Sequence, residues 1–190
     1  MNQGIELPLF SHQSLSFDYL SLCRSINVEV VQDILFFGSS PAYNRFLIQQ
    51  EVFSLFMKKF PEIRYLKMRS IEHHIFYLPK AKTCLDSLCE LECDTSIEPV
   101  YFYGLAYICK HVQRFVVINS NVKGNDGVIK LIEVQTNLRY FEWRDNLLDE
   151  EFNYEHVKDF HEGTFLALEK KADTLNHLIM SFYWVRYIET

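Results

Sequence analysis

The amino-acid sequence predicts an α+β domain in which an antiparallel β-meander over about 114–143 packs with several helices. Three observations lead to this prediction: a β-prone segment at 115–119, a cluster of turn residues at 121–127, and alternating polarity at 128–134. Turn residues between short β-prone runs are typical of hairpins. No linker or internal repeat is apparent, so residues 1–190 are expected to form one globular domain.

The first sixty residues are expected to contain a helix, a strand and a second helix. Phe17 and Leu20 lie three residues apart, which indicates a short helix. The β-branched and aromatic bias of the next segment favours a strand. Ser40 followed by Pro41 is a good start for a long helix. The predicted elements are a helix at Leu15–Arg24, a strand at Val28–Phe37 and a helix at Ala42–Phe60.

The middle of the chain is expected to alternate between strand and helix. The segment that ends before Pro79 is predicted as a strand, and leucines that recur every three residues favour a helix after it. A strongly apolar segment follows, and a buried helix is expected there. The predicted elements are a strand at Ile71–Leu78, a helix at Lys80–Cys93 and a helix at Val100–His111.

The last third of the chain holds the predicted meander and two further elements. The meander strands are Phe115–Asn119, Val128–Val134 and Leu138–Trp143, joined by the turn residues at 121–127 and 136–137. Tyr154–Asp173 has an apolar stripe at helical spacing. Leu178–Ile188 is apolar and aromatic, and it is predicted to be a final strand or a docked terminal helix.

Composition places the chain among ordinary globular proteins. Hydrophobic residues make up 48% and charged residues 23%, which argues against a disordered chain. No stretch approaches the roughly 20 apolar residues that a membrane span needs. Residues 1–22 contain no Lys or Arg to form the start of a secretory signal, and the five cysteines are odd in number. A cytoplasmic protein with reduced thiols is therefore expected.

Charge is unevenly distributed along the chain. The net charge is −6, and residues 142–162 alone carry eight acids against two bases. The acidic balance disfavours nucleic-acid binding, which normally uses a positive surface. A basic protein partner is favoured instead, because opposite charge speeds encounter. Most charge runs in globular proteins are only solvated faces, and that interpretation also remains open here.

Two metal sites were considered as alternatives. A zinc site would use Cys89, Cys93, Cys109 and His111, although only the first two approach the usual ligand spacing. A metal-dependent hydrolase or nuclease would use Asp126, Glu133 and Gln135. These residues resemble, only thinly, the acid and acid-x-Lys pattern of restriction-endonuclease-type nucleases, with Gln in place of Lys. No cofactor is expected from the sequence, and glycine-rich phosphate loops are absent from it.

The leading hypothesis is a non-enzymatic binding protein, with bacterial toxin-immunity inhibitors as a model for its size and charge. Aromatic residues make up 15% of the chain, and aromatics are enriched at protein interfaces. The protein would occlude a basic partner through an acidic, aromatic-rich surface. The predicted contact residues are Glu142, Asp145, Asp149, Glu150, Glu151, Glu155 and Asp159, with Tyr140 and Trp143 as anchors.

Overall fold

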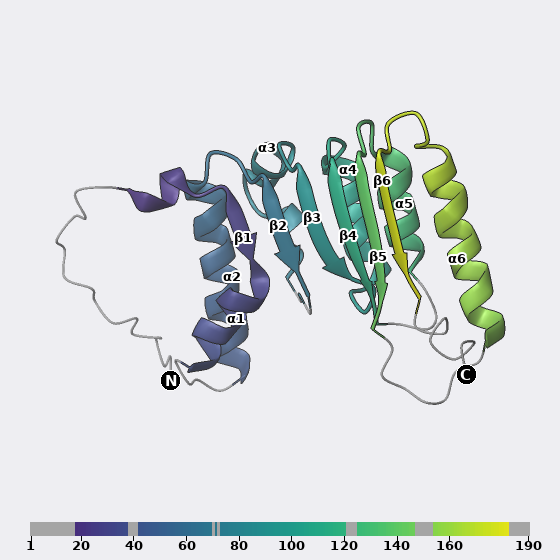
Figure 1. Cartoon of the computed structure of the whole chain (residues 1–190). Helices are drawn as coiled ribbons and strands as arrows, with labels where there is room; N and C mark the ends of the chain where they lie inside the picture. Colours follow the sequence, from purple (N-terminus) through teal and green to yellow (C-terminus); the bar gives the residue numbers. More distant parts are fainter. Residues whose placement is uncertain are drawn as a thin grey trace.

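The protein is built on a six-stranded parallel sheet whose strands lie in chain order (Figure 1). The computed structural model describes residues 18–37, 42–69, 71, 73–120, 125–146 and 154–182. All five pairs of neighbouring strands are parallel. The strands are β1 (Ser25–Asn27), β2 (Tyr65–Met68), β3 (Glu90–Asp94), β4 (Arg114–Asn119), β5 (Tyr140–Asp145) and β6 (His177–Ser181).

Helical segments make up most of the connections between the strands and form one layer. α4 packs on α5, and α5 packs on α6, as expected for successive crossovers on the same side of a sheet. Figure 1 shows α4 and α5 behind the strands of the second half of the sheet. The helical elements are η1 (Tyr19–Leu22), α1 (Val28–Phe37), α2 (Ala42–Lys59), η2 (Ile75–Tyr77), α3 (Ala81–Leu85), α4 (Pro99–Ile108), α5 (Asp126–Val134) and α6 (Tyr154–Glu169).

This α/β architecture shows that the predicted α+β meander is wrong. Residues 128–134 form α5 rather than the middle strand of a meander. The side chains that are buried there, Val128, Leu131 and Ile132, recur at i, i+3 and i+4, which is the spacing of a helix face. Asn125 begins the helix, because its side-chain oxygen accepts hydrogen bonds from the N–H groups of Gly127 and Val128. Asn125, one of the predicted turn residues, therefore caps a helix; residues 121–124 lie outside the described ranges.

Three other predicted elements also differ from the structure. Val28–Phe37 is helix α1. Asn27, the residue before it, accepts a hydrogen bond from the backbone N–H of Glu29 and so caps the start of the helix. The predicted strand at 71–78 contains the short helix η2, and the predicted helix at 80–93 divides into α3 and β3. The predictions at α2, α4, β4, β5 and α6 are confirmed in type, with shifted ends. For Leu178–Ile188 the sequence allowed a strand or a terminal helix, and residues 178–181 of this segment belong to strand β6. The predicted helix at 15–24 is reduced to η1 within the described residues.

The parallel strands recur at a nearly constant spacing, which reveals a structural repeat that the sequence does not show. Tyr65, Glu90, Arg114 and Tyr140 stand side by side in register, at spacings of 25, 24 and 26 residues. The next residue in this row, His177, follows after 37 residues, because α6 makes that crossover longer. Stacked strand–crossover units of this length are typical of solenoid proteins, in which each unit packs mainly on its neighbours.

The same hydrogen-bond arrangement joins each unit to the next. At the start of each new strand, two successive backbone N–H groups donate to one carbonyl oxygen of the preceding unit. The shared carbonyls belong to Arg24, Arg64, Cys89, Gln113 and Arg139, and the N···O distances run from 2.7 to 3.2 Å. Because the arrangement recurs five times, it fixes the register of every strand pair.

One hydrophobic core lies between the sheet and the helix layer. It includes side chains from α1 to α6 and from the sheet face that meets them. The sheet contributes Leu66, Met68, Leu91, Cys93, Phe115, Val117, Phe141 and Trp143, all of them buried. None of the helices in the described ranges is both long enough and apolar enough to span a bilayer.

Close packing of α4 on α5 requires a glycine at position 127. A Cβ atom at this position would collide with the carbonyl oxygen of Pro99 and lie 2.8 Å from the Cβ atom of Phe102. Backbone atoms cannot move aside cheaply, so Gly127→Ala is expected to lower the free energy of unfolding by about 1–3 kcal/mol, as overpacking does. Urea denaturation followed by circular dichroism measures this loss.

Gly163→Ala in α6 is the matched control for this prediction. The added methyl group would meet only the end of the flexible Ile129 side chain. Alanine also has a higher helix propensity than glycine by about 1 kcal/mol. Equal or higher stability is therefore expected for the control, and equal losses in the two variants would contradict the proposed α4–α5 contact.

Candidate functional site

The sheet has a second face, opposite the helix layer, and this face is the candidate functional site. Every described α-helix contributes to the one core on the other side. Val116 and Ile118, which point to the second face, do not belong to that core although both are buried. We call the second face the outer face; it carries Tyr65, Lys67, Glu90, Glu92, Asp94, Arg114, Val116, Ile118, Tyr140, Glu142, Arg144, His177 and Ile179.

Aromatic and basic side chains stack in one row across this face. Arg114, Tyr140 and His177 occupy neighbouring strands in register. The guanidinium carbon of Arg114 lies 4.6 Å from the centre of the Tyr140 ring, and this ring lies 6.0 Å from that of His177. Contact with a cation over an aromatic ring holds both groups in place. The row therefore presents planar groups that are already ordered.

A second row consists mainly of paired charges. Lys67 lies 3.2 Å from Glu92 and 3.3 Å from Glu29 of α1. Glu142 accepts hydrogen bonds from the Nε of Arg144 at 2.6 Å and from the hydroxyl of Tyr140 at 2.7 Å. These charges are fixed by their neighbours, which gives the outer face a defined pattern of positive and negative groups.

The electrostatics of the outer face follow from these pairs. The hydrogen bond from Arg144 lowers the pKa of Glu142, which keeps the carboxylate ionised at neutral pH. The hydrogen bond with Glu92 raises the pKa of Lys67 in the same way. These shifts favour the charged form of both groups, so neither Glu142 nor Lys67 is a group that exchanges a proton readily at neutral pH.

The structure separates the residues predicted to contact a partner. Glu142 and Tyr140 lie on the outer face. Trp143 is fully buried on the opposite face, and its indole N–H donates to Asp145 at 2.7 Å. The remaining predicted contacts cannot be placed: Asp149, Glu150 and Glu151 lie outside the described residues, as do the side chains of Glu155 and Asp159 on α6.

Asp145 belongs to a polar network at the carboxyl ends of β3, β4 and β5. Asn119 donates to Asp145 and accepts from the hydroxyl of Thr95, each at 2.9 Å. The same hydroxyl accepts from the backbone N–H of Ser120, whose side chain donates to Asp94. Ligands often bind at this end of parallel sheets. Here the polar groups bond to one another across adjacent units, which indicates a structural role.

The three residues of the hydrolase alternative lie on or next to α5, and they have different local surroundings. Asp126 and Glu133 stand at opposite ends of α5 instead of on a strand. Glu133 lies 2.9 Å from Lys170 and 3.4 Å from Lys130, and these lysines lower its pKa. The side chain of Gln135 is buried and forms hydrogen bonds with the backbone of Val112, Cys109 and Leu131. The arrangement gives no shared metal position to these three residues.

The cysteines of the zinc alternative serve as packing groups. The five cysteines are free thiols. The thiol of Cys109 donates to the carbonyl of Leu85, and burial raises its pKa to about 12. Burial also raises the pKa of Cys93, so neither thiol ionises readily. Across the described ranges, no three His, Cys, Asp or Glu side chains gather in a way that could hold a metal ion.

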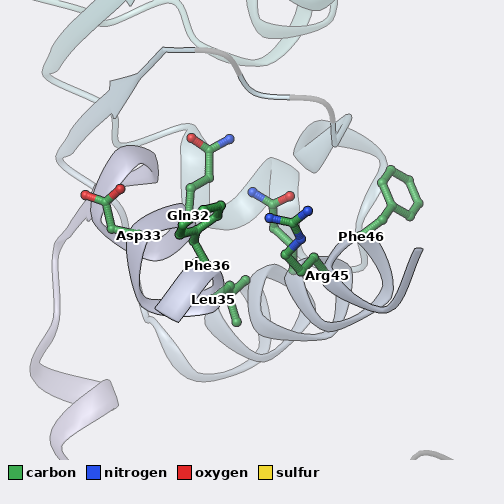
Figure 2. A pocket seen from close by; sticks show the side chains of 7 residues that line it. Gln32, Asp33, Leu35, Phe36, Arg45 and Phe46 are labelled. Carbon is green, nitrogen blue, oxygen red and sulfur yellow. The ribbon is translucent and has the colours of Figure 1, made fainter. Parts of the chain in front are cut away.

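A pocket of about 370 Å³ lies between α1 and α2 (Figure 2). Its described lining includes one carboxylate, Asp33, and one guanidinium, Arg45, which stands over the Phe36 ring at 5.3 Å. The side-chain N–H₂ of Gln49 is buried there without a hydrogen-bond acceptor in the described structure. These groups could bind a small polar molecule, but the described lining holds no hydroxyl, thiol or imidazole for nucleophilic chemistry.

The free energy of unfolding is expected to fall in acid because of His161. The imidazole packs between the rings of Trp143 and Phe182, with ring centres 5.6 and 5.0 Å away. Burial lowers its pKa below 6.5, although the charge of Asp145 acts in the opposite direction. Below pH 6.5, the unfolded chain therefore binds a proton at this residue more readily than the folded chain, and folding stability falls.

The variant His161→Gln tests this coupling, because it removes the titrating group. Unfolding free energies at pH about 7.5 and about 5.5 are expected to differ less in the variant than in the wild type, since the reference pKa of histidine is about 6.5. An unchanged difference would show that His161 does not contribute.

Comparison with known proteins gives no relative on which to base a function. No protein-family model matches the chain, and neither a curated protein nor a solved structure matches it.

Proposed function

We propose that the protein is a non-enzymatic protein-binding module that engages its partner through the outer face. The observation that carries this proposal is the ordered array of aromatic and charged side chains on the sheet face opposite the shared core. Of the described helices, α1 reaches the β2 end of this face through Glu29. Solenoid proteins commonly use such extended faces for binding. Arg and Tyr, which meet at Arg114 and Tyr140, are also the residue types enriched at binding hot spots.

The pairing of charges on this face favours a protein partner over a small ligand. The rows span neighbouring strands, and strands in a sheet are about 4.8 Å apart. A partner that covers the whole face can satisfy fixed charges of both signs, whereas a small molecule would reach only a few. Val116 and Ile118 are already buried beneath these rows, so a partner would contact mainly the charged and aromatic side chains above them.

An immunity-type inhibitor of a basic effector is the specific form of this function that we propose. It is supported by the net charge of −6, which would speed capture of a basic protein. The outer face itself contributes little of that attraction, because its carboxylates already pair with Lys67, Arg114 and Arg144. We therefore assign specificity to the outer face and long-range attraction to the acidic balance of the whole chain. The proposal includes a cytoplasmic location.

Two charge-reversal variants test the proposal. Arg114→Glu changes the centre of the outer face, and Lys110→Glu makes the same change in net charge at an exposed position outside the sheet. A partner captured by the wild type from its native cells serves as the probe. Arg114→Glu is expected to weaken its binding by more than about tenfold, as the loss of a hot-spot residue does, while Lys110→Glu stays near the wild type.

The comparison separates recognition from general electrostatics. If both variants bind equally well, the partner does not contact the centre of the outer face and the proposal is wrong. If both weaken equally, only net charge matters and the face has no specific role. Circular dichroism of both variants ensures that folded proteins are compared.

A further inference from the structure

Within the described part of the chain, the last strand of the sheet is an edge that lacks the features by which proteins usually protect such edges. Strand β6 is five residues long, and its sequence His-Leu-Ile-Met-Ser contains no Pro, Gly, Lys, Arg, Asp or Glu. Natural edge strands avoid pairing by being short, charged, bulged or covered. The other edge, β1, is only three residues long. The solenoid is therefore open to further pairing at its β6 end.

Apolar side chains are exposed on both sides of this edge. Leu178 is 50% exposed and Ile179 is 42% exposed, and they point to opposite faces of the sheet. Phe165 and Leu166 of the neighbouring α6 are 42% and 53% exposed. The terminal units of a solenoid normally have a polar outer surface, because no further unit packs on them. The exposed apolar surface at this end is instead typical of a unit on which another unit packs.

The backbone of β6 is oriented to form new hydrogen bonds. The N–H of His177 donates to Arg139 of the preceding unit, so His177 directs its backbone groups toward β5. Directions alternate along a strand, which turns the N–H and C=O groups of Leu178 and Met180 away from the sheet. No backbone hydrogen bond from these two N–H groups to the open side is recorded among the described residues.

We propose that this edge pairs with the same edge of a second copy of the chain. A two-fold axis perpendicular to the sheet at Ile179 makes the two β6 strands antiparallel. Leu178 of each copy then faces Met180 of the other and exchanges both backbone hydrogen bonds with it, while Ile179 faces its own copy across the axis. The strand is uncharged throughout, so the symmetric pairing brings no like charges together.

The same axis gives the dimer a consistent architecture. Rotation about an axis perpendicular to the sheet keeps both helix layers on one side and both outer faces on the other. The two α6 helices approach each other, and Phe165 and Leu166 can add apolar contact area there. The result is a continuous twelve-stranded sheet with two recognition faces that point the same way, a geometry that supports bivalent binding.

Sedimentation of the full chain over a wide concentration range tests this pairing. The wild type is expected to form a dimer, and Ile179→Lys is expected to be a monomer because it places two like charges on the axis. Ile34→Lys is the matched control: Ile34 is 66% exposed on α1, at the opposite end of the solenoid, and the variant should dimerise normally. A wild type that stays monomeric at all concentrations overturns the proposal.

A cross-linking variant tests the register and does not depend on the behaviour of Ile179→Lys. Residues facing each other across the axis have Cα atoms about 4.5 Å apart, which is within disulfide range. Ile179→Cys, in a background where the half-buried Cys23 and Cys89 are replaced by Ser, should form a covalent dimer on mild oxidation. Ile34→Cys in that background should not. A dimer that cross-links equally through both positions contradicts pairing at β6.

Discussion

Replacing Trp143 with alanine is expected to lower the free energy of unfolding by about 3–5 kcal/mol, the usual cost of removing a large buried aromatic side chain. The indole is fully buried between β5 and the helix layer. Its N–H donates to Asp145, which also accepts from Asn119, so the variant loses both packing and a link in the polar network. Urea denaturation followed by far-ultraviolet circular dichroism measures the loss.

Trp143→Phe separates the two contributions. It retains most of the packing and loses the indole N–H, so about 1–3 kcal/mol is expected, the cost of a small cavity together with the loss of one donor to the half-buried Asp145. A loss of less than about 1 kcal/mol for Trp143→Ala would mean that the side chain is exposed. An exposed indole is what the sequence-based prediction of a partner anchor requires, so this result decides between the two roles.

The second large effect is expected at Gln135. This side chain is 1% exposed and makes three hydrogen bonds to backbone groups. Its oxygen accepts from the N–H of Val112 at 2.9 Å, and its N–H₂ donates to the carbonyls of Cys109 and Leu131 at 2.9 and 2.8 Å. Gln135→Ala leaves all three groups buried without a partner, which should cost about 2–4 kcal/mol.

Thr136→Ala is the appropriate control for Gln135→Ala. Thr136 is the next residue, and its hydroxyl also donates to a backbone carbonyl, that of Lys110, but this bond is exposed to water. Water can replace it, so a change below about 1 kcal/mol is expected. Comparable losses in the two variants would contradict the assignment of Gln135 as a buried connection between successive units.

The sequence has a pattern, in two of the strands, that the meander prediction does not take into account. In β3 and β5, polar and apolar residues alternate, as in Glu-Leu-Glu-Cys and Tyr-Phe-Glu-Trp. Alternation is typical of a sheet with one face exposed. Residues 90–93 are instead predicted as part of a helix, because leucines recur every three residues over 85–91. Parallel sheets are usually covered on both faces. The physical reason for the exception is that successive crossovers all lie on one side.

The helices between the strands explain why the parallel order was missed. At α5, local alternation at 128–134 follows a cluster of turn residues, and this combination predicts a strand. The competing helical spacing of Val128, Leu131 and Ile132 was present in the same segment. If α5 is counted as a strand, the short turns on either side of it make it antiparallel to β4 and β5. The meander prediction follows from this one error.

The candidate site could be predicted only in part. Tyr140 and Glu142 were identified, because aromatic and acidic residues cluster near them in the sequence. Lys67, Glu92 and Arg114 were missed, since their contacts come from register across β2, β3 and β4 rather than from sequence proximity. Trp143 was misplaced for the opposite reason: it neighbours Glu142 in sequence but points to the other side of the sheet.

Site-specific photo-cross-linking in the native cells is the most direct test of the central claim that the outer face binds the partner. A photoreactive phenylalanine analogue replaces Tyr140 on the outer face or, as the control, Tyr107, which is 75% exposed on α4. Our account predicts one defined cross-linked protein from position 140 and none from position 107. The same partner cross-linked from position 107 and absent from position 140 would contradict the account.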